Sequence, residues 1–357
     1  MYEIDFLPVG NSNGDAICLQ YSAPGGGILV HVVDGAYTET GTKIVEHIRR
    51  YYGANFFINH MVLSHADNDH ATGLVEVMKN MKVQHLWMNR PWLYAAETLQ
   101  HFHGLYTVDG LVKKMREMHP YLVDLENLAE QQGTVIHDVF QGARIGNFTV
   151  LAPSRERYIR LIPDLDKTPT RHSATDSFTN YLVDALKKVR DYLYETWDIE
   201  TLSNDPDPTS ASNETSVVQL GVLDGSHILL TADVGPEGLN EAADYAARLG
   251  LLTPPSFVQV PHHGSRRNVT PAVLDRWLGP KMANGSVFGT AYCSVGDNKT
   301  DYPRGQVSNA FLRRGYPVHV TRGEQKMHQS GSPGRGWGPS IPLPLAQEVE
   351  DKAKSAA

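Results

Sequence analysis

Short apolar runs separated by polar turns recur along the chain and predict a mixed α/β fold. Apolar runs bounded by Gly-, Asn- and Asp-rich turns predict strands. These strands are expected at 4–9, 16–21, 28–33, 60–63, 134–136, 148–151, 216–222, 227–231, 257–260, 289–295 and 318–321. Apolar positions three and four residues apart predict helices. These helices are expected at 42–52, 71–81, 97–103, 111–128, 238–249, 271–278 and 306–314. Strands followed by helices, twice over, predict two sheets enclosed by helices, an αββα sandwich.

Two polar, helix-rich stretches interrupt this pattern, at about 91–132 and 154–212. We interpret them as helical insertions into a single domain that spans residues 1–345. The charged segment 346–357 is predicted to be a disordered tail.

One polar motif stands out directly after a buried strand, in the run His65-Ala66-Asp67-Asn68-Asp69-His70. Imidazole and carboxylate together suit a borderline or hard divalent cation such as Zn²⁺ or Mn²⁺. The alternative is a polar turn whose aspartates cap the following helix. Four potential ligands within six residues favour a metal site.

Two more apolar strands end in residues of the same chemistry. Asp233 follows the run 228–232, and His262-His263-Gly264-Ser265 follows the run 258–261. Taken alone, the aspartate is typical of a helix cap and the histidine pair of a structural or surface position. Three strand ends at one edge of a sheet, however, would bring these side chains into one site.

With these motifs the chain resembles the metallo-β-lactamase superfamily and, within it, the hydrolase domain of ComEC-like competence proteins. The resemblance covers about residues 3–325. It rests on the runs 65–70 and 262–265, whose combination is specific, and on weaker likenesses. The weaker ones lie at 9–16, 32–35, 213–216, 230–233, 294–296 and 302–303.

The resemblance implies a layout for two divalent cations, Zn²⁺ or Mn²⁺. His65 and Asp67 would hold the first ion, Asp69 and His70 the second, and Asp233 would bridge them. One histidine of the pair would complete the second site. We favour His263 for this role, which leaves His262 to face the substrate as a proton donor or a phosphate contact. The residues themselves leave this choice open.

The chain departs from the wider superfamily at two positions. Asp67 stands where a histidine is usual, and Asn213 or a neighbour replaces the histidine before the strand at 216. Oxygen ligands shift the preference toward harder ions such as Mn²⁺, and a one-metal enzyme is the alternative. Asp34 is expected to orient a ligand from behind.

Paired cations activate water and clamp phosphate oxygens, so we expect a phosphodiesterase or nuclease acting on DNA or nucleotides. Asp69 and His262 are the catalytic candidates. The candidate substrate contacts are Asn213, Ser216, Ser265 and Arg266. Basic residues at 266, 267, 299, 304 and 322 would suit a phosphate groove. The aromatic residues Trp87, Trp92 and Tyr94 would stack bases or, in the interpretation we favour, pack in the core or a lid.

Two other functions remain open from the sequence. One is hydrolysis of a small non-nucleotide substrate, such as a lactone or a phosphorylated ester, and the other is a catalytically silent effector or binding module. The same metal core would serve both a phosphodiesterase and a hydrolase of a small substrate, so the ligands do not separate these two functions. The complete ligand set argues against a catalytically silent module.

Composition limits the binding partners, the state of the cysteines and the cellular location that we expect for the protein. A formal net charge of −8 excludes a uniformly basic nucleic-acid-binding surface but not a local basic groove. Cys18 and Cys293 lie in apolar runs and are expected to be buried free thiols. No basic leader and no run of about 18–20 apolar residues is present, so we expect a cytoplasmic protein without a membrane partner. A protein partner or a homo-oligomer is compatible with the sequence.

Overall fold

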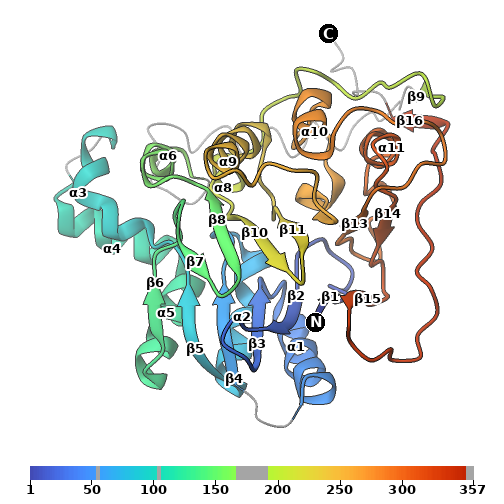
Figure 1. Cartoon of the computed structure of the whole chain (residues 1–357). Coiled ribbons are helices and arrows are strands. Elements are labelled where there is room, and N and C mark those ends of the chain that lie inside the picture. Colours follow the sequence, from blue (N-terminus) through green and yellow to red (C-terminus); the bar gives the residue numbers. More distant parts are fainter. Residues whose placement is uncertain (54–56, 103–105, 166–191, 351–357) are drawn as a thin grey trace.

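The computed structural model describes residues 1–53, 57–102, 106–165 and 192–350. The strands form two seven-stranded sheets and one two-stranded sheet (Figure 1). Part of the predicted second insertion, 166–191, lies outside the described residues. Within the described part of the chain, no helix has the length and apolar character needed to cross a membrane.

The first large sheet is built mainly from the N-terminal part of the chain. Its strands, in spatial order, are β15 (Lys326–Ser330), β1 (Tyr2–Phe6), β2 (Ile17–Ser22), β3 (Ile28–Val33), β4 (Phe57–Val62), β5 (Lys82–Trp87) and β6 (Val135–His137). The strands from β15 to β3 are antiparallel, and those from β3 to β6 are parallel.

The second large sheet comes from the C-terminal half. Its strands, in spatial order, are β14 (Val318–Val320), β13 (Thr290–Cys293), β12 (Phe257–Gln259), β11 (Ser226–Leu230), β10 (Val218–Leu223), β8 (Phe148–Ala152) and β7 (Arg144–Ile145). The strands from β11 to β14 are parallel, and the hairpin of β10 and β11 is antiparallel, as the turn at Asp224-Gly225 predicts.

Three hydrophobic cores hold the layers together. The first packs one face of the first sheet against helices α1 (Thr38–Tyr51), α2 (Asn68–Asn80), α4 (Val108–Met118) and α5 (Pro120–Gln132). The second packs the other sheet against α9 (Pro236–Arg248), α10 (Pro271–Leu278) and α11 (Gly305–Arg313). The third, with Phe6, Phe148 and Phe257, lies between the sheets. This four-layer arrangement confirms the predicted αββα sandwich (Figure 1).

The predicted first insertion is helical. It contains η1 (Pro91–Tyr94), α3 (Ala95–Thr98), η2 (Leu99–His101), α4 and α5. The single helix predicted at 111–128 is two helices in the structure, because Pro120 lacks the N–H that a continuous helix needs and instead starts α5. The second insertion contains α6 (Arg155–Leu161), η3 (Ile162–Asp164) and α8 (Ala211–Glu214), but also the strand β9 (Tyr192–Tyr194).

Some strands escaped the sequence pattern. β15 has a single apolar residue, Met327, and pairs only with β1 at the edge of its sheet, so it carries no apolar pattern. The prediction of a disordered tail does not hold at β16 (Glu348–Glu350), which pairs with β9 and buries Val349. Such long-range pairing leaves no local signal. Residues 351–357 lie outside the described part of the chain.

The sheet topology sets up a functional edge. Asp34 follows β3 directly, and His65, Asp233 and His262 lie three residues after the ends of β4, β11 and β12. β3 is parallel to β4, and β11 is parallel to β12, so each pair of strands delivers its side chains at one end. Ligand sites in sheets of this kind lie at the carboxyl ends of parallel strands.

Candidate metal centre

Six of the predicted ligands and catalytic residues meet between the two sheets. They fall into overlapping groups of three in which one ligand atom from each residue lies within 4.8 Å of the others. The groups are His65, His70 and Asp233; Asp69, His70 and His263; and Asp233, His262 and His263. Asp233 lies at the middle of this metal centre: its Oδ2 is 3.5 Å from His70 Nε2, 3.5 Å from His262 Nε2 and 3.7 Å from His263 Nε2.

The geometry does not favour a capping role for the aspartates. Asp67 stands at the N-cap of α2, yet its side chain makes no capping hydrogen bond and lies 3.6 Å from His65 Nε2. Asp233 precedes the N-cap of α9, which is Gly235. Both carboxylates are instead directed to histidines.

Buried atoms without a hydrogen-bond partner provide the test for a cation. Within the described part of the chain, His65 Nε2, His70 Nε2 and Asp233 Oδ1 are buried and have no such partner. Leaving a buried polar atom unsatisfied costs about 1–3 kcal/mol. Three of them directed at one point fit a divalent cation, which nitrogen and carboxylate oxygen both ligate.

The other nitrogen of each histidine is held from behind. Asp34 Oδ2 lies 2.7 Å from His70 Nδ1, and Asp34 also accepts a hydrogen bond from Ser64 Oγ at 2.6 Å. Ser64 Oγ is in turn 3.0 Å from His65 Nδ1. The expected orienting role of Asp34 is thus visible for His70, and through Ser64 it extends to His65. Such contacts fix the ring and direct Nε2 toward a metal.

The adjacent histidines differ in their support and exposure. The backbone oxygen of Ser294 lies 3.0 Å from His263 Nδ1, and the side chain of His263 is only 2% exposed. His262 Nδ1 lies 2.9 Å from Asn268 Oδ1 and 3.2 Å from Asn213 Nδ2, and its side chain is 29% exposed. Both rings present Nε2 to Asp233, but only that of His262 reaches solvent.

The carboxylates of the centre create a field that favours positive charge. Burial lowers the pKa of His70, but the carboxylates of Asp34 and Asp233 outweigh it, so the pKa lies well above its usual value. Burial raises the pKa of Asp233, whereas His262, His263 and His70 together hold it well below the usual range. Burial lowers the pKa of His263 to about 4, which leaves its lone pair available at neutral pH.

The backbone at this edge is strained. Ala232, His262 and His263 have φ values of +46°, +46° and +55°. Left-handed backbone is uncommon for residues other than glycine, and such strain clusters at functional sites. Here the bend turns both imidazoles back toward Asp233, and Gly264 follows where an added Cβ would lie 2.2 Å from Pro303 Cβ.

The four predicted substrate contacts lie in different settings. Asn213 contacts His262, as described. Ser216 is fully buried, and within the described residues its Oγ has no hydrogen-bond partner. Ser265 is buried, and its Oγ accepts a hydrogen bond from Arg267 N at 3.3 Å. Arg266 donates to the backbone oxygen of Glu350 at 3.1 Å and lines a cavity of about 240 Å³ together with Arg267.

Sequence reasoning missed several residues that support the centre. Asp15 is buried and groups with Asp34 and His70, and its Oδ2 accepts a hydrogen bond from Gln259 Nε2 at 2.9 Å. Burial raises the pKa of Asp15 well above the usual value. Asp15 belongs to the glycine-rich turn at 9–16, which offered a weak signal. Ser294 belongs to the weak likeness at 294–296, whereas Ser64 and Asn268 carried no signal.

The aromatic residues 87, 92 and 94 are buried, which matches the favoured interpretation of packing. Cys18 and Cys293 are buried free thiols, as expected. Of the other basic candidates, Arg304 lies 3.4 Å from Asp301 and 3.7 Å from Glu350, so part of its charge is balanced locally.

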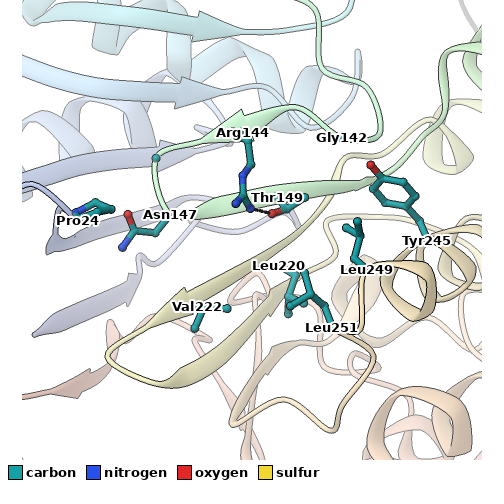
Figure 2. Close-up of a pocket in the computed structure, with 11 residues that line it drawn as sticks. Pro24, Gly142, Arg144, Asn147, Thr149, Leu220, Val222, Tyr245, Leu249 and Leu251 are labelled. Atoms are coloured by element: carbon teal, nitrogen blue, oxygen red, sulfur yellow. Dashed lines mark hydrogen bonds between the residues drawn. The ribbon is translucent and has the colours of Figure 1, made fainter.

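A separate cavity of about 600 Å³ lies on the second sheet beside α9 (Figure 2). Arg144, Thr149, Leu220, Tyr245 and Leu251 are among its lining residues, and no ligand candidate is among them. The metal centre therefore does not open into this cavity.

No family model and no curated protein matches the sequence. Solved structures that resemble the chain include a motif mutant of a metallo-β-lactamase from Cronobacter sakazakii, with 12% identity, 71% of this chain and 75% of that chain covered, and a TM-score of 0.33. A metallo-β-lactamase bound to 2-mercaptoethanesulfonate has 11% identity and a TM-score of 0.32, and the match covers 77% of this chain and 86% of that chain. The diiron β-hydroxylase CmlA from Streptomyces venezuelae has 11% identity and a TM-score of 0.42, and the match covers 92% of this chain and 54% of that chain. At these low values, the function of the chain has to be inferred from its own site.

Proposed function

We propose that the chain is a metal-dependent hydrolase of the metallo-β-lactamase type that cleaves phosphodiesters of DNA or nucleotides. The observation that carries the proposal is the set of unpartnered atoms, His65 Nε2, His70 Nε2 and Asp233 Oδ1, directed at one buried point. Structural histidines are ordinarily satisfied by protein partners, whereas these are oriented from behind by Ser64 and Asp34.

The proposed layout assigns the ligands to two neighbouring ions, and the group of His65, His70 and Asp233 joins the two positions. His65 and Asp67 would hold one ion, and Asp69, His70 and His263 the other, with Asp233 placed to contact both. Zn²⁺ and Mn²⁺ suit this mixture of imidazole and carboxylate. Ions bound here would supply Lewis acidity toward phosphate oxygens and make water a stronger acid.

The protein's own groups would act around the ions. His262 is held by Asn213 and Asn268 and is exposed enough to reach substrate, so it would donate a proton to the leaving oxygen. Arg266 and Arg267 directly follow the histidine loop and line a cavity of about 240 Å³. Their guanidinium groups suit a phosphate, which supports the phosphodiester class.

The test combines metal and substrate. Purified protein would be incubated with single-stranded DNA, duplex DNA and bis-p-nitrophenyl phosphate, with Zn²⁺ or Mn²⁺ added in parallel. We expect metal-dependent cleavage that is lost in Asp69→Ala and kept in Asp224→Asn, a control in the exposed turn between β10 and β11. Bound metal without cleavage of any of the three would contradict the phosphodiester class and favour a lactone or phosphorylated ester. Failure to bind metal would contradict the hydrolase itself.

A further inference from the structure

A second set of histidines lies away from the metal centre. His31, His60, His85 and His137 occupy neighbouring strands β3, β4, β5 and β6. His31 is in register with His60, and His60 with His85. Successive ring centroids are 5.9, 5.5 and 5.1 Å apart. We call this set the histidine row.

The histidine row faces the second sheet and runs out to an edge. The rings of His31 and Phe148 of β8 lie 5.2 Å apart, which places the row on the inner face of the sandwich. β6 is the last strand of its sheet, and both His85 and His137 are partly exposed. The inner end of the row is thus enclosed, whereas its outer end is open to ions from solvent.

Burial favours the neutral form of three members of the row, His31, His60 and His137. Burial lowers the pKa of His31 well below its usual value and that of His60 to about 4, and it lowers the pKa of His137. A neutral imidazole has one nitrogen with a free lone pair and one that carries a proton. Neutral imidazole is also the form that binds metals.

The outer pair of the row has the spacing of a chelate. His85 Nδ1 and His137 Nε2 lie 3.0 Å apart. Two nitrogens at this separation, each about 2.1 Å from one ion, subtend an angle of about 90° there. Right angles suit square-planar or octahedral Cu²⁺ and Ni²⁺ better than tetrahedral Zn²⁺. We propose that His85 and His137 form a second transition-metal site, distinct from the metal centre, for Cu²⁺ or Ni²⁺.

The proton shared by His85 and His137 can be relocated when a metal ion binds. Without metal, one of the two nitrogens carries a proton and donates a hydrogen bond to the other. Binding moves that proton to the far nitrogen of the same ring through solvent, so both lone pairs face the ion and no net charge is lost from the protein. His60 supplies no third nitrogen here, because its Nδ1 accepts a hydrogen bond from Trp87 Nε1 at 3.3 Å.

Trp87 is a built-in reporter of the site. Its ring stacks on His137 with centroids 4.2 Å apart and an interplanar angle of 19°. Paramagnetic Cu²⁺ bound to His137 would quench the fluorescence of this indole, and Trp87→Phe would remove the signal without removing a ligand. The bound ion would also link β5 to β6 and stabilise the edge of the sheet.

The experiment titrates Cu²⁺ into the full-length protein whose metal centre is first loaded with Zn²⁺, and follows tryptophan fluorescence and bound copper. We expect stoichiometric quenching whose apparent affinity falls more than tenfold in His85→Gln and in His137→Gln. His101→Gln, which removes an exposed imidazole on η2, should behave as the wild type. In Trp87→Phe, copper should bind with most of the quenching lost.

One result would overturn the site: equal quenching and equal bound copper in the wild type and both glutamine variants. The quenching would then come from copper in the metal centre. Melting curves of the metal-free variants show whether each one folds, and His85→Gln and His137→Gln provide two independent readouts. The site does not depend on the proposed hydrolase function.

Discussion

The metal centre and the histidine row both gather several imidazoles, the centre from the ends of strands in both large sheets and the row from the first sheet alone, but they surround them differently. In the centre, an oxygen holds His65, His70 and His263 from behind, and Asp233 lies on the open side of His70 and His263. In the row, the rings bond to one another, to Trp87 or to Tyr21. The carboxylates of the centre favour a bound positive charge, whereas burial of His60 disfavours its protonated form, so protonation of the row should weaken the fold in acid.

Of the substitutions that separate the metal centre from the histidine row, Asp233→Asn should have the largest effect. The amide keeps the shape but removes the charge that lies within 3.5–3.7 Å of three histidines. We expect hydrolysis to fall to background and the second metal equivalent to be lost, as measured by model-ester turnover and metal analysis. Copper quenching at the histidine row should be unchanged. Retained activity would remove Asp233 from the mechanism.

Asp34→Asn should weaken the centre less. Asp34 contacts the candidate ligand His70 and the nearby Ser64 rather than the predicted ion site itself. Loss of such a supporting carboxylate typically costs about 10–100-fold in metal affinity. Competition with a chelator would measure this loss, with Glu39→Gln on the exposed start of α1 as the control. An unchanged affinity would show that burial alone orients His70.

The histidine row should make the fold sensitive to acid. The pKa of His60 is about 4 in the folded protein, against about 6.5 when unfolded. The unfolded state therefore binds the extra proton first, and stability falls as pH drops from about 6.5 toward about 4. Because His60 is only partly buried, we expect its share to be about 1–2 kcal/mol. Urea unfolding at pH 7 and pH 4 should show a smaller difference in His60→Phe than in the wild type. An equal difference in both would place the acid sensitivity elsewhere.

The same contrast explains what the sequence could predict. The ligands of the metal centre follow strand ends, and two of the motifs are compact, so runs such as His65–His70 are visible without a structure. Their supports are not. Asp15 contacts Gln259 across 244 residues of the chain, and Asn268 holds His262 through a loop with no regular spacing. The partners of a ligand are set by packing of the sheets rather than by local pattern.

The histidine row was invisible for a related reason. Each of its members sits alone in an apolar strand, where a single histidine is typical of the core, and only the register of four strands brings them together. The polar edge strand β15 and the terminal strand β16 share this property, since each is defined by its partner. Local periodicity predicted most of the strands with an apolar face, but it missed β5, whose short apolar pattern follows directly after α2, as well as the polar edge strands.

Asn213→Ala should have the smallest effect of these substitutions. It tests which of the two adjacent histidines, His262 or His263, binds the metal and which acts on the substrate. His263 is held by a backbone oxygen that no substitution removes, whereas His262 is held by the side chains of Asn213 and Asn268. If His262 acts on the substrate, loosening it should lower kcat about 3–10-fold and leave metal affinity unchanged. If His262 is instead a ligand, metal affinity should fall as it does in Asp34→Asn. Chelator competition beside steady-state kinetics separates these outcomes, and a loss of affinity would reverse the roles proposed for His262 and His263.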